Sequence, residues 1–231
     1  MSDRLVVTEE NELKEVSIPE RIEHPAWMKV LARIISVVFH PLFVPVYLTY
    51  FILEIHSYQF AGIDPWIKTL KLLLIGITCC FMPLMSILLL KGLNFIDSIF
   101  LKTQKERIAP YIICMTFYFS TWYFFKKQHE VGDLVSMTMA IFNASVFGFI
   151  TNIFLKVSMH AIAVGVMSTF MALLAYTDSA NLSLYLSVAV IIAGLVCTAR
   201  LIVSDHTQKE IYLGFFIGVF SQLAAHYFVY A

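Results

Sequence analysis

Charged residues are scarce in this sequence. Asp, Glu, Lys and Arg make up 14% of its 231 residues, whereas an ordinary soluble domain has about 25%. Hydrophobic residues make up 59% and lie in long blocks between short polar segments. This composition excludes a soluble globular domain and predicts an integral membrane protein. The 16 basic and 16 acidic residues cancel, so the net charge indicates no polyanionic partner such as nucleic acid.

The sequence also lacks a cysteine pattern and a cleavable leader. Its four cysteines lie in apolar runs without CxxC spacing or nearby metal-ligand residues, which indicates neither a disulfide framework nor a zinc site. Residues 1–30 lack the basic start, apolar core and small-residue cleavage site of a signal peptide. We interpret them as a polar N-terminal tail, and residues 31–231 as a single transmembrane helical domain.

The apolar blocks are long enough to cross a bilayer as helices, which takes about 20 residues each. None shows the alternation of a transmembrane barrel strand. The predicted fold class is therefore all-α, a polytopic membrane bundle of about seven (6–7) transmembrane helices. The expected spans are residues 32–53, 70–90, 110–126, 135–155, 159–177, 182–200 and 211–230.

The polar segments between these spans sort onto two sides of the membrane. The first side is far richer in Lys and Arg than the second. The positive-inside rule then predicts that the first side faces the cytoplasm, in what we expect to be a bacterial inner (cytoplasmic) membrane. The first side comprises the tail and residues 91–109, 156–158 and 200–210, and the second comprises residues 54–69, 127–134 and 178–181.

Three clusters of polar residues fall on this basic side. The first precedes the third expected span, the second opens the fifth, and the third joins the sixth to the seventh. In order, they are Lys102-Thr-Gln-Lys105-Glu-Arg107-Ile-Ala-Pro110, Lys156-Val-Ser158-Met-His160 and Arg200-x5-His206-x3-Glu210. Two spans separate each cluster from the next, so we expect all three on one membrane face.

The third cluster has a spacing with a direct chemical meaning. His206 and Glu210 are four residues apart, so on a helix they share one face and can hydrogen-bond. A carboxylate on one ring nitrogen fixes the tautomer and leaves the other nitrogen as a base or nucleophile. His160, delivered from another helix, adds a second imidazole that can protonate a leaving group.

The remaining groups suit a phosphate. Lys102, Arg107 and Arg200 can neutralise phosphoryl oxygens, and Ser158 is the expected N-cap of the fifth span, where free N–H groups favour anions. Together the clusters predict a phosphoryl-transfer site, and we expect no cofactor. Two local expectations accompany it: Pro110 in the first turn of its helix, and Asp205 as an N-cap with Gln208 as its partner.

The three clusters resemble the signature of the type-2 phosphatidic acid phosphatase superfamily of integral membrane lipid phosphate phosphatases. The third, Ala199-Arg200-x5-His206-x3-Glu210, matches the spacing of Ser-Arg-x5-His-x3-Asp. The second keeps the Ser and His of Pro-Ser-Gly-His. The first resembles Lys-x6-Arg-Pro but has four residues between Lys102 and Arg107, with the proline three beyond. The resemblance covers roughly residues 100–215.

This resemblance implies roles for seven residues. It implies His206 as the nucleophile that forms a phosphohistidine, oriented by Glu210, and His160 as general acid and then base. Lys102, Arg107, Ser158 and Arg200 would bind the phosphate without a metal, with Lys105 as the alternative to Lys102. The implied substrate is a lipid phosphate: phosphatidic acid, phosphatidylglycerol phosphate or a polyprenyl diphosphate.

Four other functions are weighed against this one. A non-catalytic lipid-phosphate-binding membrane protein of the same fold is suggested by the departures in the first two motifs. A transporter would need half-helix signals in two repeats, which are missing. A prenyltransferase would need paired aspartate-rich sites, for which Asn94-Phe-Ile-Asp97 is the one weak candidate. Haem ligation would need two facing histidines, with His40 and His226 as the thin possibility.

Overall fold

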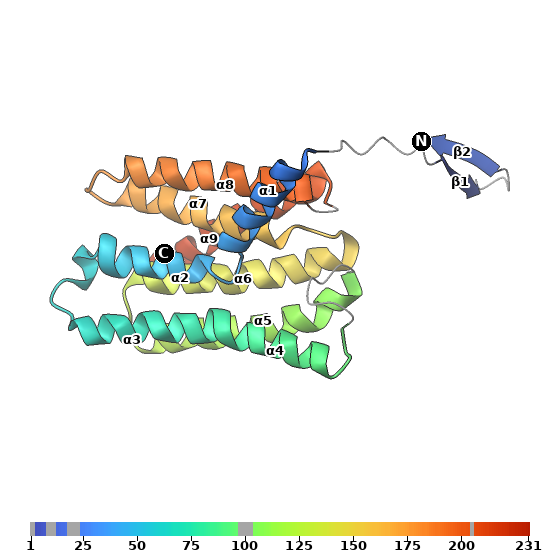
Figure 1. Ribbon diagram of the computed structural model, residues 1–231. Helices are drawn as coiled ribbons and strands as arrows, with labels where there is room; N and C mark the ends of the chain where they lie inside the picture. The colour runs from blue at the N-terminus through green and yellow to red at the C-terminus, as the bar shows by residue number, and fades with distance from the viewer. Residues whose placement is uncertain (1–2, 8–12, 18–23, 97–103, 204–205) are drawn as a thin grey trace.

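The computed structural model describes residues 3–7, 13–17, 24–96, 104–203 and 206–231. Within them the chain forms a helical bundle in which six helical spans are long and apolar enough to cross a membrane (Figure 1). These spans confirm an all-α, polytopic membrane protein. They are Pro65–Gly92, Arg107–Lys127 and Gly132–Phe154, then Met159–Thr177, Ser183–Val203 and Gln208–Tyr230.

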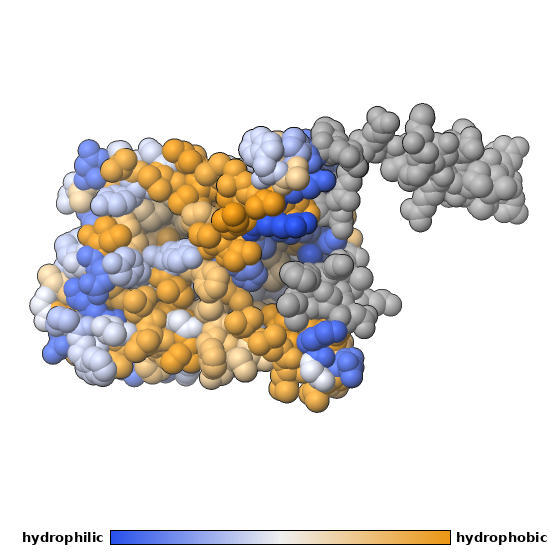
Figure 2. Space-filling view, viewed as in Figure 1, coloured by the Kyte–Doolittle hydropathy of each residue, from blue (hydrophilic) through white to orange (hydrophobic). Residues whose placement is uncertain are grey.

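The surface of the bundle explains why it needs a bilayer. Large hydrophobic side chains are exposed along four of these spans, Pro65–Gly92, Arg107–Lys127, Ser183–Val203 and Gln208–Tyr230, whereas Met159–Thr177 is mostly buried inside the bundle. Figure 2 shows hydrophobic residues over most of the visible face, with hydrophilic residues gathered toward the two ends. In lipid such side chains need no cover, while helices satisfy their backbone groups internally. The multi-pass topology therefore accounts for an apolar surface that would be costly in water.

The first expected span, residues 32–53, is not one helix. The chain forms α1 (Ala26–Val38), a turn, α2 (Val44–Tyr50) and a π-helical turn (Phe51–Ile55). Pro41 explains the break, because the residue before a proline avoids helical geometry and proline lacks an N–H. The two halves pack differently: α1 lies along α8, whereas α2 contacts α3, α6 and α7. The first of the seven expected spans is thus two short helices.

The next span is continuous but irregular. It consists of α3 (Pro65–Ile75), a π-helical turn (Gly76–Phe81) and α4 (Met82–Gly92). The wide turn precedes Pro83, which would otherwise clash with the carbonyl one turn earlier. Asp64 caps the start of α3 by accepting a hydrogen bond from Trp66 N at 2.7 Å. Before it lies a short 3-10 helix (Tyr58–Phe60).

The other helices are α5 (Gln104–Lys127), α6 (Gly132–Phe154), α7 (Met159–Thr177), α8 (Ser183–Val203) and α9 (Gln208–Tyr230). Because α5 begins at Gln104, Pro110 lies inside the helix, and its expected place in the first turn is wrong.

Two strands, β1 (Asp3–Val7) and β2 (Leu13–Ser17), pair antiparallel within the segment expected to be a polar tail. Helical structure begins at Ala26, before the expected boundary at residue 31.

The main hydrophobic core is built from α2, α5, α6, α7 and α8, and the closest helix packing is that of α9 against α6 and α7. At Gly165 an added Cβ would clash with the carbonyl of Phe215, and at Gly218 with the carbonyl of Ile162. Glycine at both positions therefore lets the two backbones touch. This close contact fixes the start of α7 beside the start of α9.

The connections alternate between the two ends of the bundle. The end of α4 and the start of α5 lie at one end, as do the α6–α7 connection, the end of α8 and the start of α9 (Figure 1). The α2–α3, α5–α6 and α7–α8 connections lie at the other end. We call the first the motif end, because all three sequence clusters fall there, and the second the opposite end. For the polar segments that the structure describes, the grouping at two ends of the bundle agrees with the prediction.

Candidate functional site

The central contact of the motif end joins His206 to Glu210. His206 lies in the α8–α9 connection, and its Nδ1 is 2.9 Å from Glu210 Oε2 in the first turn of α9. A carboxylate can only accept, so Nδ1 carries the hydrogen and Nε2 keeps its lone pair. The hydrogen bond expected from the four-residue spacing is present. His206 is 8% exposed, so its ring is held in a nearly closed environment.

Glu210 is held in turn by a capping box. Thr207 is the N-cap of α9: its Oγ1 accepts from Glu210 N at 3.4 Å, and its N donates to Glu210 Oε2 at 3.1 Å. The expected cap at Asp205 is therefore wrong, because Thr207-x-x-Glu210 satisfies two backbone donors reciprocally; Asp205 lies outside the described residues. One carboxylate thus both starts α9 and orients His206.

Two arginines act on His206. Burial lowers the pKa of His206 below its ordinary value, the hydrogen bond to Glu210 opposes this, and the positive charges of Arg107 and Arg200 lower the pKa further. Arg107 is 7% exposed and its Nη1 donates to Val157 O at 2.9 Å, which ties α5 to the α6–α7 connection. Arg200 lies in the last turn of α8. Burial and the two cations therefore favour the neutral form of the ring.

Ser158 connects α7 to α9 at the same place. It is the N-cap of α7, as expected, with Oγ accepting from Ala161 N at 3.4 Å. Its backbone N donates to Glu210 O at 3.4 Å. Ser158 is completely buried, and Gly214 passes so close that a Cβ there would crowd the carbonyl of Ser158. The N-terminal turns of α7 and α9 thus form one packed unit.

His160, in the first turn of α7, belongs to the same cluster. It lies within electrostatic range of Arg200 and His206. Its Nε2 is 3.0 Å from the carbonyl oxygen of Ser36 on α1, and its ring contacts that of His40 with centroids 5.2 Å apart. The second and third sequence clusters are therefore brought together.

Of the first sequence cluster, the structure places Arg107 at the site. Lys102 lies outside the described residues, and Lys105 lies in α5 with a side chain that is not described. Among the seven residues expected at the site, the structure brings together six: Arg107, Ser158, His160, Arg200, His206 and Glu210.

Sequence reasoning did not include Ser36 and His40 in the site. The only signal was His40-Pro41 inside an apolar span.

The paired-histidine haem alternative is wrong for these residues, because His40 lies at the motif end. His226 is 18 residues from the start of α9, which is about 27 Å at 1.5 Å per residue. The described residues contain no group of three His, Cys, Asp or Glu side chains placed to hold a metal.

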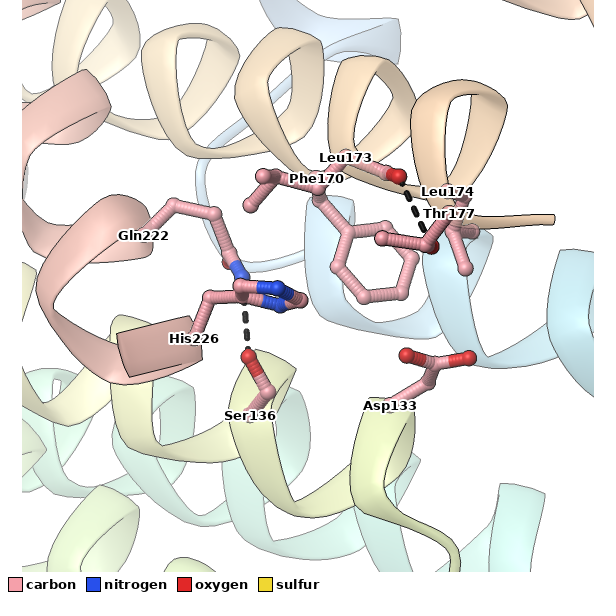
Figure 3. A pocket seen from close by; sticks show the side chains of 8 residues that line it. All are labelled: Asp133, Ser136, Phe170, Leu173, Leu174, Thr177, Gln222 and His226. Atoms are coloured by element: carbon pink, nitrogen blue, oxygen red, sulfur yellow. Dashed lines mark hydrogen bonds between the residues drawn. The ribbon is translucent and has the colours of Figure 1, made fainter. Parts of the chain in front are cut away.

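A second polar cluster lies toward the opposite end, among α6, α7 and α9 (Figure 3). Gln222 Nε2 donates to Ser136 Oγ at 3.1 Å, an interhelical hydrogen bond between α9 and α6. Asp133 accepts from Tyr230 OH at 2.6 Å and from Gln59 Nε2 at 2.7 Å. These contacts cross-link three segments of the bundle, and they are separate from the site around His206.

A comparison of this chain with protein-family models, with curated proteins and with solved structures finds no significant match.

Proposed function

We propose that this protein is a metal-independent membrane lipid phosphate phosphatase that works through a phosphohistidine intermediate. The observation that carries the proposal is the 2.9 Å contact between His206 Nδ1 and Glu210 Oε2, beside the positive charges of Arg107 and Arg200. A neutral imidazole with one nitrogen fixed by a carboxylate is a nucleophile. Cations around it suit the charge of a phosphoryl group.

In the first step, the lone pair of His206 Nε2 attacks phosphorus. The bond between phosphorus and the headgroup oxygen breaks, and its electron pair leaves with that oxygen. His160, in its protonated form, gives the oxygen a proton, so the dephosphorylated lipid departs as an alcohol or, from a diphosphate, as a monophosphate. Glu210 stabilises the positive charge that develops on the His206 ring.

In the second step, neutral His160 takes a proton from water, and the resulting hydroxide oxygen bonds to phosphorus. The phosphorus–nitrogen bond breaks, and its electron pair returns to His206 Nε2. Inorganic phosphate leaves, and His160 is again protonated. Arg107 and Arg200 neutralise the phosphoryl oxygens in both steps, with Lys102 proposed as a further ligand.

The place of the site favours a lipid headgroup. The motif end is where helices meet the aqueous interface, and the helix surfaces beside it expose apolar side chains. A headgroup would approach His206 from this interface while acyl or prenyl tails stay among lipids. Phosphatidic acid, phosphatidylglycerol phosphate and polyprenyl diphosphates all have this form. We further propose a bacterial inner membrane, with the motif end cytoplasmic because basic residues concentrate there.

Phosphate release from these three lipids in detergent micelles, with EDTA present, tests the proposal. The wild type should release phosphate, and His206→Ala should reduce release to background. His129→Asn is the matched control, because His129 is exposed at the opposite end and should be dispensable. Release that persists in His206→Ala would refute the histidine mechanism.

A lipid-phosphate-binding protein without turnover is the second candidate. Two observations argue against catalysis. Ser158 is completely buried, and Arg107 already donates a hydrogen bond to the carbonyl of Val157. Both groups are thus engaged by the protein itself. Saturable binding of the same lipids by folded wild-type protein, without phosphate release from any of them, would establish this alternative.

A further inference from the structure

The turn between α1 and α2 places an additional histidine at the site. His40 precedes Pro41, where the helix breaks, and its ring meets that of His160 edge to face, with centroids 5.2 Å apart and planes at 82°. The two residues are 120 positions apart in the chain, so only the fold brings them together. His40 is also within electrostatic range of Arg200.

The same segment fixes which nitrogen of His160 carries a proton. His160 Nε2 lies 3.0 Å from the carbonyl oxygen of Ser36. A carbonyl oxygen only accepts hydrogen bonds, so Nε2 must donate. No described residue hydrogen-bonds to the other ring nitrogen, Nδ1. Nδ1 is therefore the nitrogen that can exchange a proton with a bound substrate.

The ring of His40 is itself held in place by the turn. Its Nδ1 accepts a hydrogen bond from the backbone N–H of Leu42 at 3.3 Å. This contact places the hydrogen of the neutral ring on Nε2 and fixes the ring within the turn. Ser36, whose carbonyl His160 uses, is buried on α1, and α1 packs along α8, the helix that carries Arg200. Both contacts of His160 thus depend on the broken first span.

We propose that His40 and the carbonyl of Ser36 together position His160, so that Nδ1 of His160 delivers a proton to the leaving oxygen and accepts one from water. His40 is a positioning residue, because its argued effect is on His160 and not on the phosphate. This inference rests on the proposed phosphatase function. It assigns a purpose to the break at Pro41, since a continuous helix would carry residue 40 along its own axis and away from the turn.

Three groups surround His160 from three elements: His40 from the α1–α2 turn, Arg200 from α8 and His206 from the α8–α9 connection. Two of them are rings and one is a permanent cation. Without the ring of His40, the side chain of His160 loses the surface that limits its rotation and is free to leave the Ser36 carbonyl.

The decisive variant is His40→Asn. An asparagine side-chain oxygen can accept the N–H of Leu42, as in an Asx turn, so the turn is kept and only the ring is lost. We expect an unchanged melting temperature and KM, with kcat lower by about tenfold or more, a part of the roughly 10²–10⁴-fold effect of general acid–base catalysis. His40→Ala removes the turn contact as well and should also lower the melting temperature. His129→Asn controls for loss of a histidine elsewhere.

Ring ¹⁵N spectra of His160 in the full-length protein provide a readout that does not depend on turnover. The wild type should show the hydrogen on Nε2, and His40→Asn should give a mixture of tautomers or averaged signals. A wild type that shows the hydrogen on Nδ1 would overturn the proposal. So would His40→Asn with unchanged His160 spectra and unchanged kcat. If the wild type releases no phosphate at all, the phosphatase function fails, and the spectra alone still decide whether His40 positions His160.

Discussion

The two ends of the bundle use their polar residues in different ways. At the opposite end, acidic and basic groups neutralise one another: Lys71 pairs with Glu130, and His56 Nε2 lies 2.7 Å from Asp178 Oδ2. At the motif end, Glu210 is the one carboxylate among the side chains that the structure describes, amid several cations and three clustered imidazoles. Groups satisfied by the protein stabilise it, whereas an excess of positive charge suits an external anion.

The largest expected effect is at Glu210. Glu210→Gln keeps an N3 residue that can complete the capping box but removes the charge that stabilises the developing imidazolium. We expect kcat to fall by roughly 10²–10⁴-fold with little change in melting temperature, by analogy with the effect of amidating a carboxylate that orients a catalytic histidine.

The matched change at the opposite end is Asp178→Asn, which removes a carboxylate from the other histidine pair. It should leave kcat unaltered. Equal loss of activity in both variants, measured as phosphate release, would erase the distinction between the two ends.

The next effect concerns the close contact between α7 and α9. Gly218→Ala forces a Cβ against the carbonyl of Ile162, where α7 and α9 touch. We expect a loss of about 1–3 kcal/mol in the free energy of unfolding, typical of overpacking, and a fall in activity because the starts of both helices move apart. Gly194→Ala in α8 is the control, since nothing lies near its added Cβ. Thermal unfolding in detergent should separate the two, and similar melting temperatures would contradict the packing argument.

A moderate effect is expected in the pH profile. The attacking form of His206 is neutral, so kcat/KM falls as pH drops through the pKa of His206. Burial and the two arginines lower that pKa, which keeps the wild type active below the ordinary range of histidine. Arg107→Gln removes one of the positive charges, so the pKa should rise and the acid limb should move to higher pH. Lys71→Gln, at the opposite end, should leave the limb in place. A shift toward lower pH in Arg107→Gln would contradict this electrostatic account.

Local features of the structure could be predicted from the sequence, whereas contacts between distant parts of the chain could not. Six spans were predictable because hydropathy over about 20 residues is a property of the local chain. The contact of His206 with Glu210 was predicted from their spacing of four, but its geometry differs, because His206 precedes the N-cap Thr207 and Glu210 reaches back to it from the first turn of α9. The contact of His160 with Ser36 joins residues 124 positions apart, and no local pattern encodes it. The prediction of one helix over residues 32–53 was wrong. Its apolar character gave no sign of the break before Pro41, and the break depends on where each half packs.

The smallest effect concerns stability at the opposite end. The backbone N–H of Ala180 is the largest cause of a lowered pKa for Asp178 in the folded protein, and the hydrogen bond to His56 adds to it, against the opposing effect of burial. A carboxyl group with a lowered folded-state pKa stabilises the fold above its unfolded pKa, and this contribution is lost as pH falls through the folded pKa. Asp178→Asn should therefore unfold at a lower temperature than the wild type at neutral pH, and the gap should close in acid. At the motif end the sign is the same, because burial and the two arginines also lower the pKa of His206 and protonation there opposes folding too. The two sites are separate, so Asp178→Asn should not change the acid limb of kcat/KM. A gap in melting temperature that stays constant from neutral to acid pH would mean that the charge of Asp178 does not stabilise this end, and the contrast between a self-neutralised end and a charge-bearing end would fail.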